Sequence, residues 1–174
     1  MKAPLPFVRT RRSRFDAPPG AFEQQAIPVA SVMITSLAPL LPVIVTMPIV
    51  PPLGFMMLLA WRLMRTDLWP AWGALPLGLF DDLFSGQPIG SAMASWTLAL
   101  IAIDMVDTRA IWRDYRQDWA LAAALIVAQL LWSLVLAGGG MSPILLVPQM
   151  LLAILAFPMC ARIAAALDRW RIGA

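Results

Sequence analysis

The side chains best suited to chemistry in this sequence are two adjacent carboxylates, Asp81 and Asp82, inside an otherwise apolar stretch. Acid–base catalysis needs two groups that face each other, whereas neighbours at i and i+1 point about 100° apart on a helix. The chain has no histidine and one cysteine, Cys160, which excludes Ser-His-Asp triads, Cys-His dyads, histidine-ligated metals and an internal disulfide. We therefore expect no catalytic residue, no metal site and no cofactor.

Asp82 lies in a segment, residues 78–90, whose glycines and proline predict a sharp turn between two helices. Gly78 precedes Asp82 by four residues, so both lie on one helix face with room for a close helix neighbour. A carboxylate just before such a break can accept backbone N–H groups from the turn or from the next helix. We expect Asp82 to lock this hairpin, and a partner contact or a proton or cation site are the alternatives. Ser85 and Gly86 can end the first helix, and Pro88 can open the next. The candidate residues of this segment are Gly78, Asp82, Ser85, Gly86, Pro88 and Gly90.

The composition predicts that this hairpin belongs to an all-α integral membrane protein. Hydrophobic residues make up 60% and charged residues 13% of the chain, against about 45–50% and about 25% in soluble domains. Charges are absent from residues 24–61, 83–103 and 119–161, and one crossing needs about 20 apolar residues. A proline or glycine turn divides each of the two longest runs. We expect a bundle of six transmembrane helices, with five as the fallback, at 27–47, 49–65, 69–84, 89–107, 119–137 and 143–167.

The basic residues predict how these helices are oriented. In the six-span arrangement all thirteen lysines and arginines fall on one side, and the three opposite turns hold none. Because basic residues concentrate in cytoplasmic loops, we expect both termini in the cytoplasm. Residues 1–26 then form a basic flexible tail, 27–167 the membrane domain and 168–174 a short basic tail.

Four arginines of the N-terminal tail form a cluster. They favour a topology signal that attracts anionic membrane lipids, at about 1 kcal/mol per basic residue, and a protein-docking arm is the alternative. Nucleic-acid binding is not expected, because the cluster is short and has no aromatic platform. These residues are Arg9, Arg11, Arg12 and Arg14.

Small residues recur every fourth position on the fourth and fifth predicted helices, where they let helices approach closely. They indicate packing within the bundle or docking of a partner's membrane helix. The two ridges are Ser91, Ser95 and Ala99, and Ala120, Ala124 and Ala128.

Two polar residues lie inside predicted helices. Asp104 is expected to reach the headgroup region or to pair with Arg62, Arg65 or Arg109. Gln129 is expected to form a hydrogen bond between helices.

The pattern Gly-x-x-x-Asp-x-x-Ser-Gly-x-x-x-Gly, formed by Gly78, Asp82, Ser85, Gly86 and Gly90, resembles that of the rod shape-determining protein MreD family. The preceding segment, 61–70, resembles the family's aromatic-Arg-Pro-Asp/Glu-Leu segment, although Thr66 stands where proline is usual. Asp81 is an acid that most members lack. The resemblance covers residues 52–109.

This resemblance implies a non-catalytic subunit of the elongasome, the bacterial inner-membrane machine that builds lateral-wall peptidoglycan and maintains rod shape. Its implied partners are MreC, MreB, RodZ, the RodA glycosyltransferase and a class B penicillin-binding transpeptidase. The implied fold is similar to the six-helix substrate-binding subunit of energy-coupling-factor transporters, which carries no implication of transport. The alternative function is a small-molecule transport or binding subunit. Such a subunit needs several polar groups at mid-membrane depth, and the sequence contains few there.

Overall fold

The computed structural model describes residues 21–40, 51–66, 68–107, 115–136, 138, 144 and 146–172. Over these residues the chain is all-helical, with six α-helices, two short 3₁₀ helices and no strand. The α-helices are α1 (Ala21–Ser36), α2 (Leu53–Met64), α3 (Ala74–Ser85), α4 (Ser91–Asp107), α5 (Tyr115–Leu136) and α6 (Leu146–Ile172). The 3₁₀ helices are η1 (Ala38–Leu40), after α1, and η2 (Ala71–Gly73), before α3.

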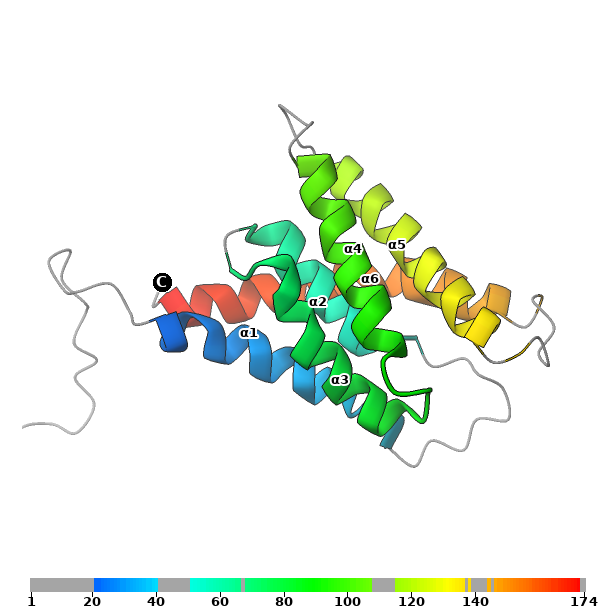
Figure 1. Ribbon diagram of the computed structural model, residues 1–174. Coiled ribbons are helices and arrows are strands. Elements are labelled where there is room, and N and C mark those ends of the chain that lie inside the picture. Colours follow the sequence, from blue (N-terminus) through cyan, green and yellow to red (C-terminus); the bar gives the residue numbers. More distant parts are fainter. Residues whose placement is uncertain are drawn as a thin grey trace, which may run out of the picture.

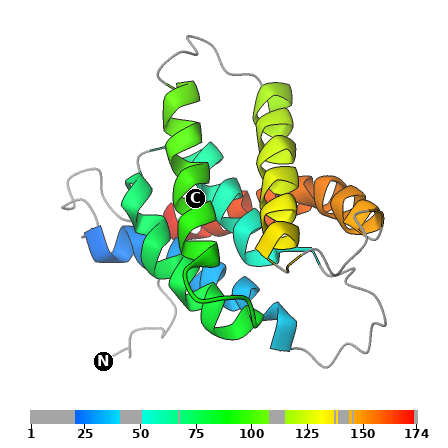
Figure 2. The same cartoon turned by 45° about the vertical axis from the view of Figure 1, so that its right-hand side comes forward.

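Successive helices alternate in direction. The C-terminal ends of α1, α3 and α5 lie with the N-terminal ends of α2, α4 and α6, at the lower right of Figure 1. The opposite helix ends lie at the left and top of the same view. Figure 2 shows the same alternation after rotation, with α4 and α5 standing side by side. The chain therefore passes back and forth between two ends of the molecule.

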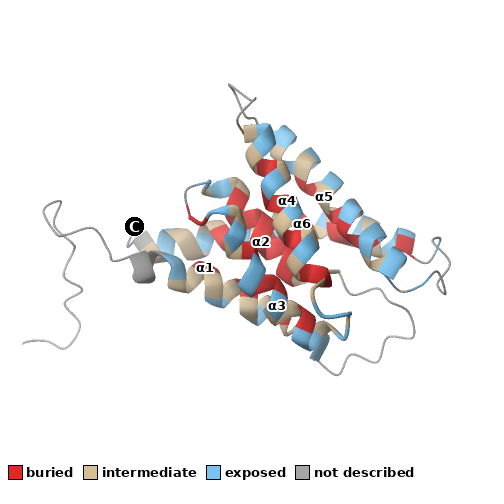
Figure 3. Cartoon of the chain, in the orientation of Figure 1, coloured by how far each residue is buried: buried red, intermediate tan, exposed pale blue. Residues whose placement is uncertain are grey.

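The core is built around α2, one of the shortest helices. Every residue from Gly54 to Arg62 is buried, because α2 contacts α1, α4, α5 and α6. Buried residues accordingly gather on α2 and on the faces turned toward it (Figure 3). The Phe55 ring packs on Trp96 of α4 with ring centroids 5.9 Å apart, and the Trp61 indole N–H donates to Ser31 Oγ of α1 at 2.8 Å. One of the two shortest α-helices described is thus the centre of the fold.

The helices differ in length from the six expected spans. Only α5 and α6, among the described residues, are long and apolar enough to cross a membrane by length and composition. The 12 residues of α2 and of α3 rise about 18 Å each, less than the ~30 Å of a bilayer's hydrocarbon core. Prolines explain the late start of α2, because Pro51 and Pro52 immediately precede it.

The described helix boundaries also shift the proposed tails. α1 begins at Ala21, inside the expected N-terminal tail, and α6 continues to Ile172, past the expected end at 167. An ion pair between Asp168 and Arg171, one turn apart at 2.6 Å, is consistent with the extension of α6. The arginines of the N-terminal cluster, Arg109 and much of the Gly138–Pro143 turn lie outside the described residues.

Candidate functional site

The Asp82 carboxylate caps the first turn of α4. Its Oδ2 accepts the backbone N–H of Gly90 at 2.8 Å and that of Met93 at 3.4 Å. Its Oδ1 accepts the Ser91 hydroxyl and the Ala92 N–H, both at 2.8 Å. The first N–H groups of a helix have no partner within the helix, and the carboxylate supplies one. The expected hydrogen bonding of Asp82 is present.

This arrangement stabilises a buried carboxylate through hydrogen bonds from one helix end. Asp82 is 3% exposed, and an isolated carboxylate at that depth would be very unfavourable. The N-terminus of a helix carries roughly half a positive elementary charge, and hydrogen bonds to an ionised acceptor are the stronger kind. The backbone of α4 therefore takes the role that an arginine would otherwise fill.

Gly78 allows α3 to approach α4 closely enough for this contact. A Cβ at Gly78 would lie 2.7 Å from both the N and the Cα of Met93 and 2.8 Å from the carbonyl carbon of Ala92. These are backbone atoms, which cannot rotate away. Gly78 and Asp82 thus act on the same turn of α4 from one face of α3, as their four-residue spacing predicts.

The turn between the two helices depends on two glycines in left-handed conformation. Gly86 follows the last residue of α3 with φ +70°, and Gly90 has φ +96°, conformations that L residues with a side chain rarely adopt. The expectation that Pro88 opens α4 is wrong, because the helix begins only after Gly90 breaks the helical backbone. Instead, the Pro88 carbonyl accepts the N–H of Ser91 at 3.0 Å.

Gln87 connects the hairpin to α5, a contact that the sequence analysis missed. Its Nε2 donates to Ser133 Oγ at 3.4 Å, and its Oε1 lies 3.2 Å from the Ser91 hydroxyl. Gln87 and Ser133 are 46 residues apart along the chain, so no local pattern could have paired them. We call Asp82, Gln87, Gly90, Ser91 and Ser133 the hairpin end of the molecule.

Asp81 faces away from Asp82, as adjacent helical positions require. Its Oδ1 lies against Gly54 of α2, at the place where Ser36 of α1 also meets that glycine. The two acids therefore serve different neighbours, Asp82 the first turn of α4 and Asp81 the junction of α1 with α2.

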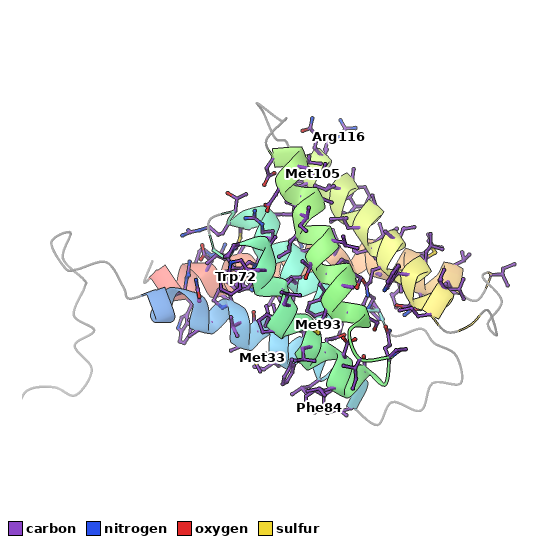
Figure 4. The ribbon with its side chains drawn as sticks, viewed as in Figure 1. Met33, Trp72, Phe84, Met93, Met105 and Arg116 are labelled. Carbon is purple, nitrogen blue, oxygen red and sulfur yellow. The ribbon has the colours of Figure 1, made fainter. Side chains whose placement is uncertain are left out.

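Ion pairs gather at the opposite end, which we call the arginine end and define by Arg62, Arg65, Asp104, Asp168 and Arg171. Arg62, although buried, donates from Nη2 to Asp104 Oδ1 and from Nη1 to the Thr66 carbonyl. Asp168 of α6 accepts from Arg171 at 2.6 Å and pairs with Arg65, the residue directly after α2, at 3.5 Å. Of the partners considered for Asp104, the described one is Arg62. In Figure 4, Phe84 near the C-terminal end of α3 and Arg116 near the N-terminal end of α5 lie far apart.

The two small-residue ridges differ in how far they are buried. On α4, Ser91 and Ala99 are buried and Ser95 is half-buried, with its hydroxyl donating to the Ser91 carbonyl at 2.9 Å. That ridge packs inside the fold. Ala120, Ala124 and Ala128 are all exposed, so the α5 ridge is not covered by any described part of the chain.

Gln129 was expected to form a hydrogen bond between helices. It is 7% exposed, and its Oε1 has no hydrogen-bond partner among the described residues. The expected bond is therefore absent from this part of the chain.

Comparison with known proteins adds no relative: no family model matches the chain, and no curated protein or solved structure matches it. Any function assigned to the chain therefore rests on its own residues and geometry.

Proposed function

We propose that this chain is a non-catalytic, multi-pass inner-membrane subunit of the elongasome, of the MreD type, and helps maintain rod cell shape. It would act by assembling with an MreC-like membrane protein and, through it, with MreB, RodZ, RodA and a class B penicillin-binding transpeptidase. Support for a membrane position comes from the length and composition of α5 and α6 and from the alternation of helix direction. The shorter α2 is compatible with this position because α1, α4, α5 and α6 surround it.

The observation that carries the proposal is that the small residues of the α4 ridge are buried or half-buried, whereas those of the α5 ridge are exposed. The polar groups and small residues of α4 are used inside the fold, where Asp82, Gly78 and the Ser91–Ala99 ridge fix it against α3 and the core. The corresponding ridge of α5 remains exposed. A helix whose small residues face outward can be approached closely by another membrane helix.

Large apolar side chains flank this exposed ridge. Leu131 and Val135 continue the same outward face of α5 toward the hairpin end, with exposures of 46% and 71%. In lipid, helix association depends on close van der Waals packing, since lipid tails are as apolar as the helices. Ala120, Ala124 and Ala128 therefore form the surface on which we place the partner helix.

The test is complementation in rod-shaped cells depleted of this chain. Depletion is expected to give round, swollen cells, and the wild-type chain to restore rods and to co-purify with the MreC-like protein. Ala124→Ile should insert at a normal level but lose both properties, because a bulky side chain holds the partner helix away. Ala166→Ile is the matched control, since it makes the same change at an exposed site of α6 and should behave as wild type.

Two results would contradict the proposal. If Ala124→Ile keeps both the complex and rod shape, the α5 ridge faces lipid only. If depletion leaves cell shape unchanged and abolishes uptake of a small solute, the chain is instead a transport or binding subunit.

A further inference from the structure

The outward face of α6 changes from apolar to basic along its length. The exposed positions of this helix recur every three or four residues, so they form one continuous stripe. In the first part of the stripe the side chains are large and apolar: Leu151, Leu155 and Met159 are 57%, 71% and 66% exposed. The stripe then carries Arg162 and Arg169. It is therefore suited to hydrocarbon over its first part and to an anion over its second.

The two arginines of this stripe are free to bind an anion together. Seven residues make nearly two turns, so both side chains leave α6 within about 20° of one direction, about 10 Å apart along the axis. Neither forms an ion pair or hydrogen bond within the described part of the chain. The single acid of α6, Asp168, is partly buried and pairs with Arg65 and Arg171. The charges of Arg162 and Arg169 are thus not neutralised by their own helix.

The two arginines flank the level at which a membrane-spanning α6 would leave the hydrocarbon. α6 is long and apolar enough to cross a membrane, and a crossing takes about 20 residues, so counted from Leu146 the boundary falls at about residue 166. An arginine facing hydrocarbon is unfavourable, but its long stem lets the guanidinium reach the headgroups. Trp170, which is 65% exposed beside Arg169, is of the type enriched at that level. The lipid phosphates would therefore lie between Arg162 and Arg169.

We propose that Arg162 and Arg169 bind the headgroup of an anionic phospholipid whose acyl chain lies along Met159 and Leu155. A guanidinium donates paired hydrogen bonds to phosphate oxygens. Two guanidiniums favour a headgroup with net negative charge over a zwitterionic one, which carries its own cation. The inference rests on the membrane position given under the proposed function. It does not depend on the protein partners, which we place on α5.

The experiment is thermal unfolding of the purified full chain in an uncharged detergent, followed by tryptophan fluorescence. The micelles contain increasing mole fractions of phosphatidylglycerol or, in the second arm, of phosphatidylcholine. Because a ligand that binds only the folded state raises Tm, we expect a saturable rise of about 3–6 °C at ten times the half-saturating fraction of phosphatidylglycerol. Phosphatidylcholine should give no saturable rise.

Variants at exposed positions separate a specific site from general attraction between charges. Arg162→Gln and Arg169→Gln should each raise the half-saturating fraction of phosphatidylglycerol about tenfold, because each removes a charge-assisted contact. Arg162→Lys keeps the charge but loses the paired donors, so its value should fall between those of wild type and Arg162→Gln. Arg116→Gln is the matched control, since it removes an exposed arginine of α5 and should bind the lipid as wild type does.

Three outcomes would overturn the site. Equal half-saturating fractions in wild type, Arg162→Gln and Arg169→Gln would show that the arginines hold no lipid. An equal response to phosphatidylcholine would show that the acyl chains act without the headgroup. A chain that stays soluble without detergent would contradict the membrane position and the proposed function together. In the first two outcomes, complementation of cell shape can still succeed, so the two failures are distinguishable.

Discussion

The two ends of this molecule hold their carboxylates by different means. At the hairpin end, Asp82 is held by three backbone N–H groups and one hydroxyl of the α4 N-terminal segment. At the arginine end, Asp104 and Asp168 are held by guanidinium groups of α2 and α6. Both ends tie helices together, yet only one of them uses basic side chains.

The sequence explains why the ends differ. Among the described residues, the arginines lie toward the C-terminal ends of α2 and α6 and at the N-terminal end of α5, which the alternation of helices brings to one side. Asp82 has no ion pair with an arginine among the described residues, and the helix N-terminus of α4 provides the positive potential instead. The difference teaches that a helix bundle whose described arginines lie toward one end can still bury an acid at the other end, provided that a backbone helix end approaches closely.

The largest effect is expected from Asp82→Ala, which breaks the hairpin end. It leaves the N–H groups of α4 and the Ser91 hydroxyl without their acceptor, and we expect a loss of about 3 kcal/mol or more of unfolding free energy. Asp81→Ala, which keeps the cap on α4, should cost less. The measurement is denaturant unfolding in detergent together with the protein level in membranes. Equal losses for the two variants would mean that the cap contributes little.

Gly78→Ala should produce the next largest effect, because the added methyl meets the backbone of Met93 and Ala92. Such overpacking costs about 1–3 kcal/mol. Gly86→Ala is the comparison: a Cβ there meets no atom within 4 Å, so only the left-handed backbone is strained, at about 1–2 kcal/mol. A smaller loss for Gly78→Ala than for Gly86→Ala, in the same unfolding assay, would contradict the close approach of α3 to α4.

Asp104→Asn tests the arginine end. The variant leaves the buried guanidinium of Arg62 with the Thr66 carbonyl but without its carboxylate. Because the Asp104 side chain is 41% exposed, solvent screens the pair, and we expect a loss of only about 1–2 kcal/mol. High salt should reduce the difference between this variant and wild type, whereas it should leave the Asp82→Ala difference nearly unchanged. If high salt reduced the losses of unfolding free energy from Asp104→Asn and from Asp82→Ala equally, the two ends would not differ in how they hold a carboxylate.

The hairpin could be predicted from sequence because its determinants are local. Gly78, Asp82, Gly86 and Gly90 lie within thirteen residues, and helix geometry alone places the first two on one face. Pairings over longer distances could not be predicted individually: Arg62 with Asp104 was one of several possibilities, and Gln87 with Ser133 was not considered. These depend on how α2, α4 and α5 pack together.

The ridges on α4 and α5 show the same limit. Ser95 and Ala124 follow the same four-residue spacing, and that spacing favours close approach without identifying the partner. One ridge packs internally and the other is exposed. The length of α2 could not be predicted either. An uncharged run sets the greatest extent that a helix can have, but it does not show where within the run the helix begins or ends.

The smallest effect is expected from Ala124→Leu, which should change unfolding free energy by no more than about 0.5 kcal/mol, because the site is exposed. Ser95→Leu, at the half-buried ridge of α4, should cost clearly more through overpacking. Both are measured on the isolated chain in detergent. A large loss from Ala124→Leu would show that α5 packs against a part of this chain rather than facing outward.

We expect the hairpin end and the arginine end to lie on opposite sides of a membrane, a claim that labelling of single cysteines tests most directly. Cys160 is buried and is replaced by alanine in the parent chain. Gln87→Cys at the hairpin end and Trp170→Cys beside the arginine end are then exposed to a membrane-impermeant maleimide in cells with a permeabilised outer membrane. Gln87→Cys should be labelled at once and Trp170→Cys only after the inner membrane is disrupted. Labelling of both positions before disruption would contradict the claim.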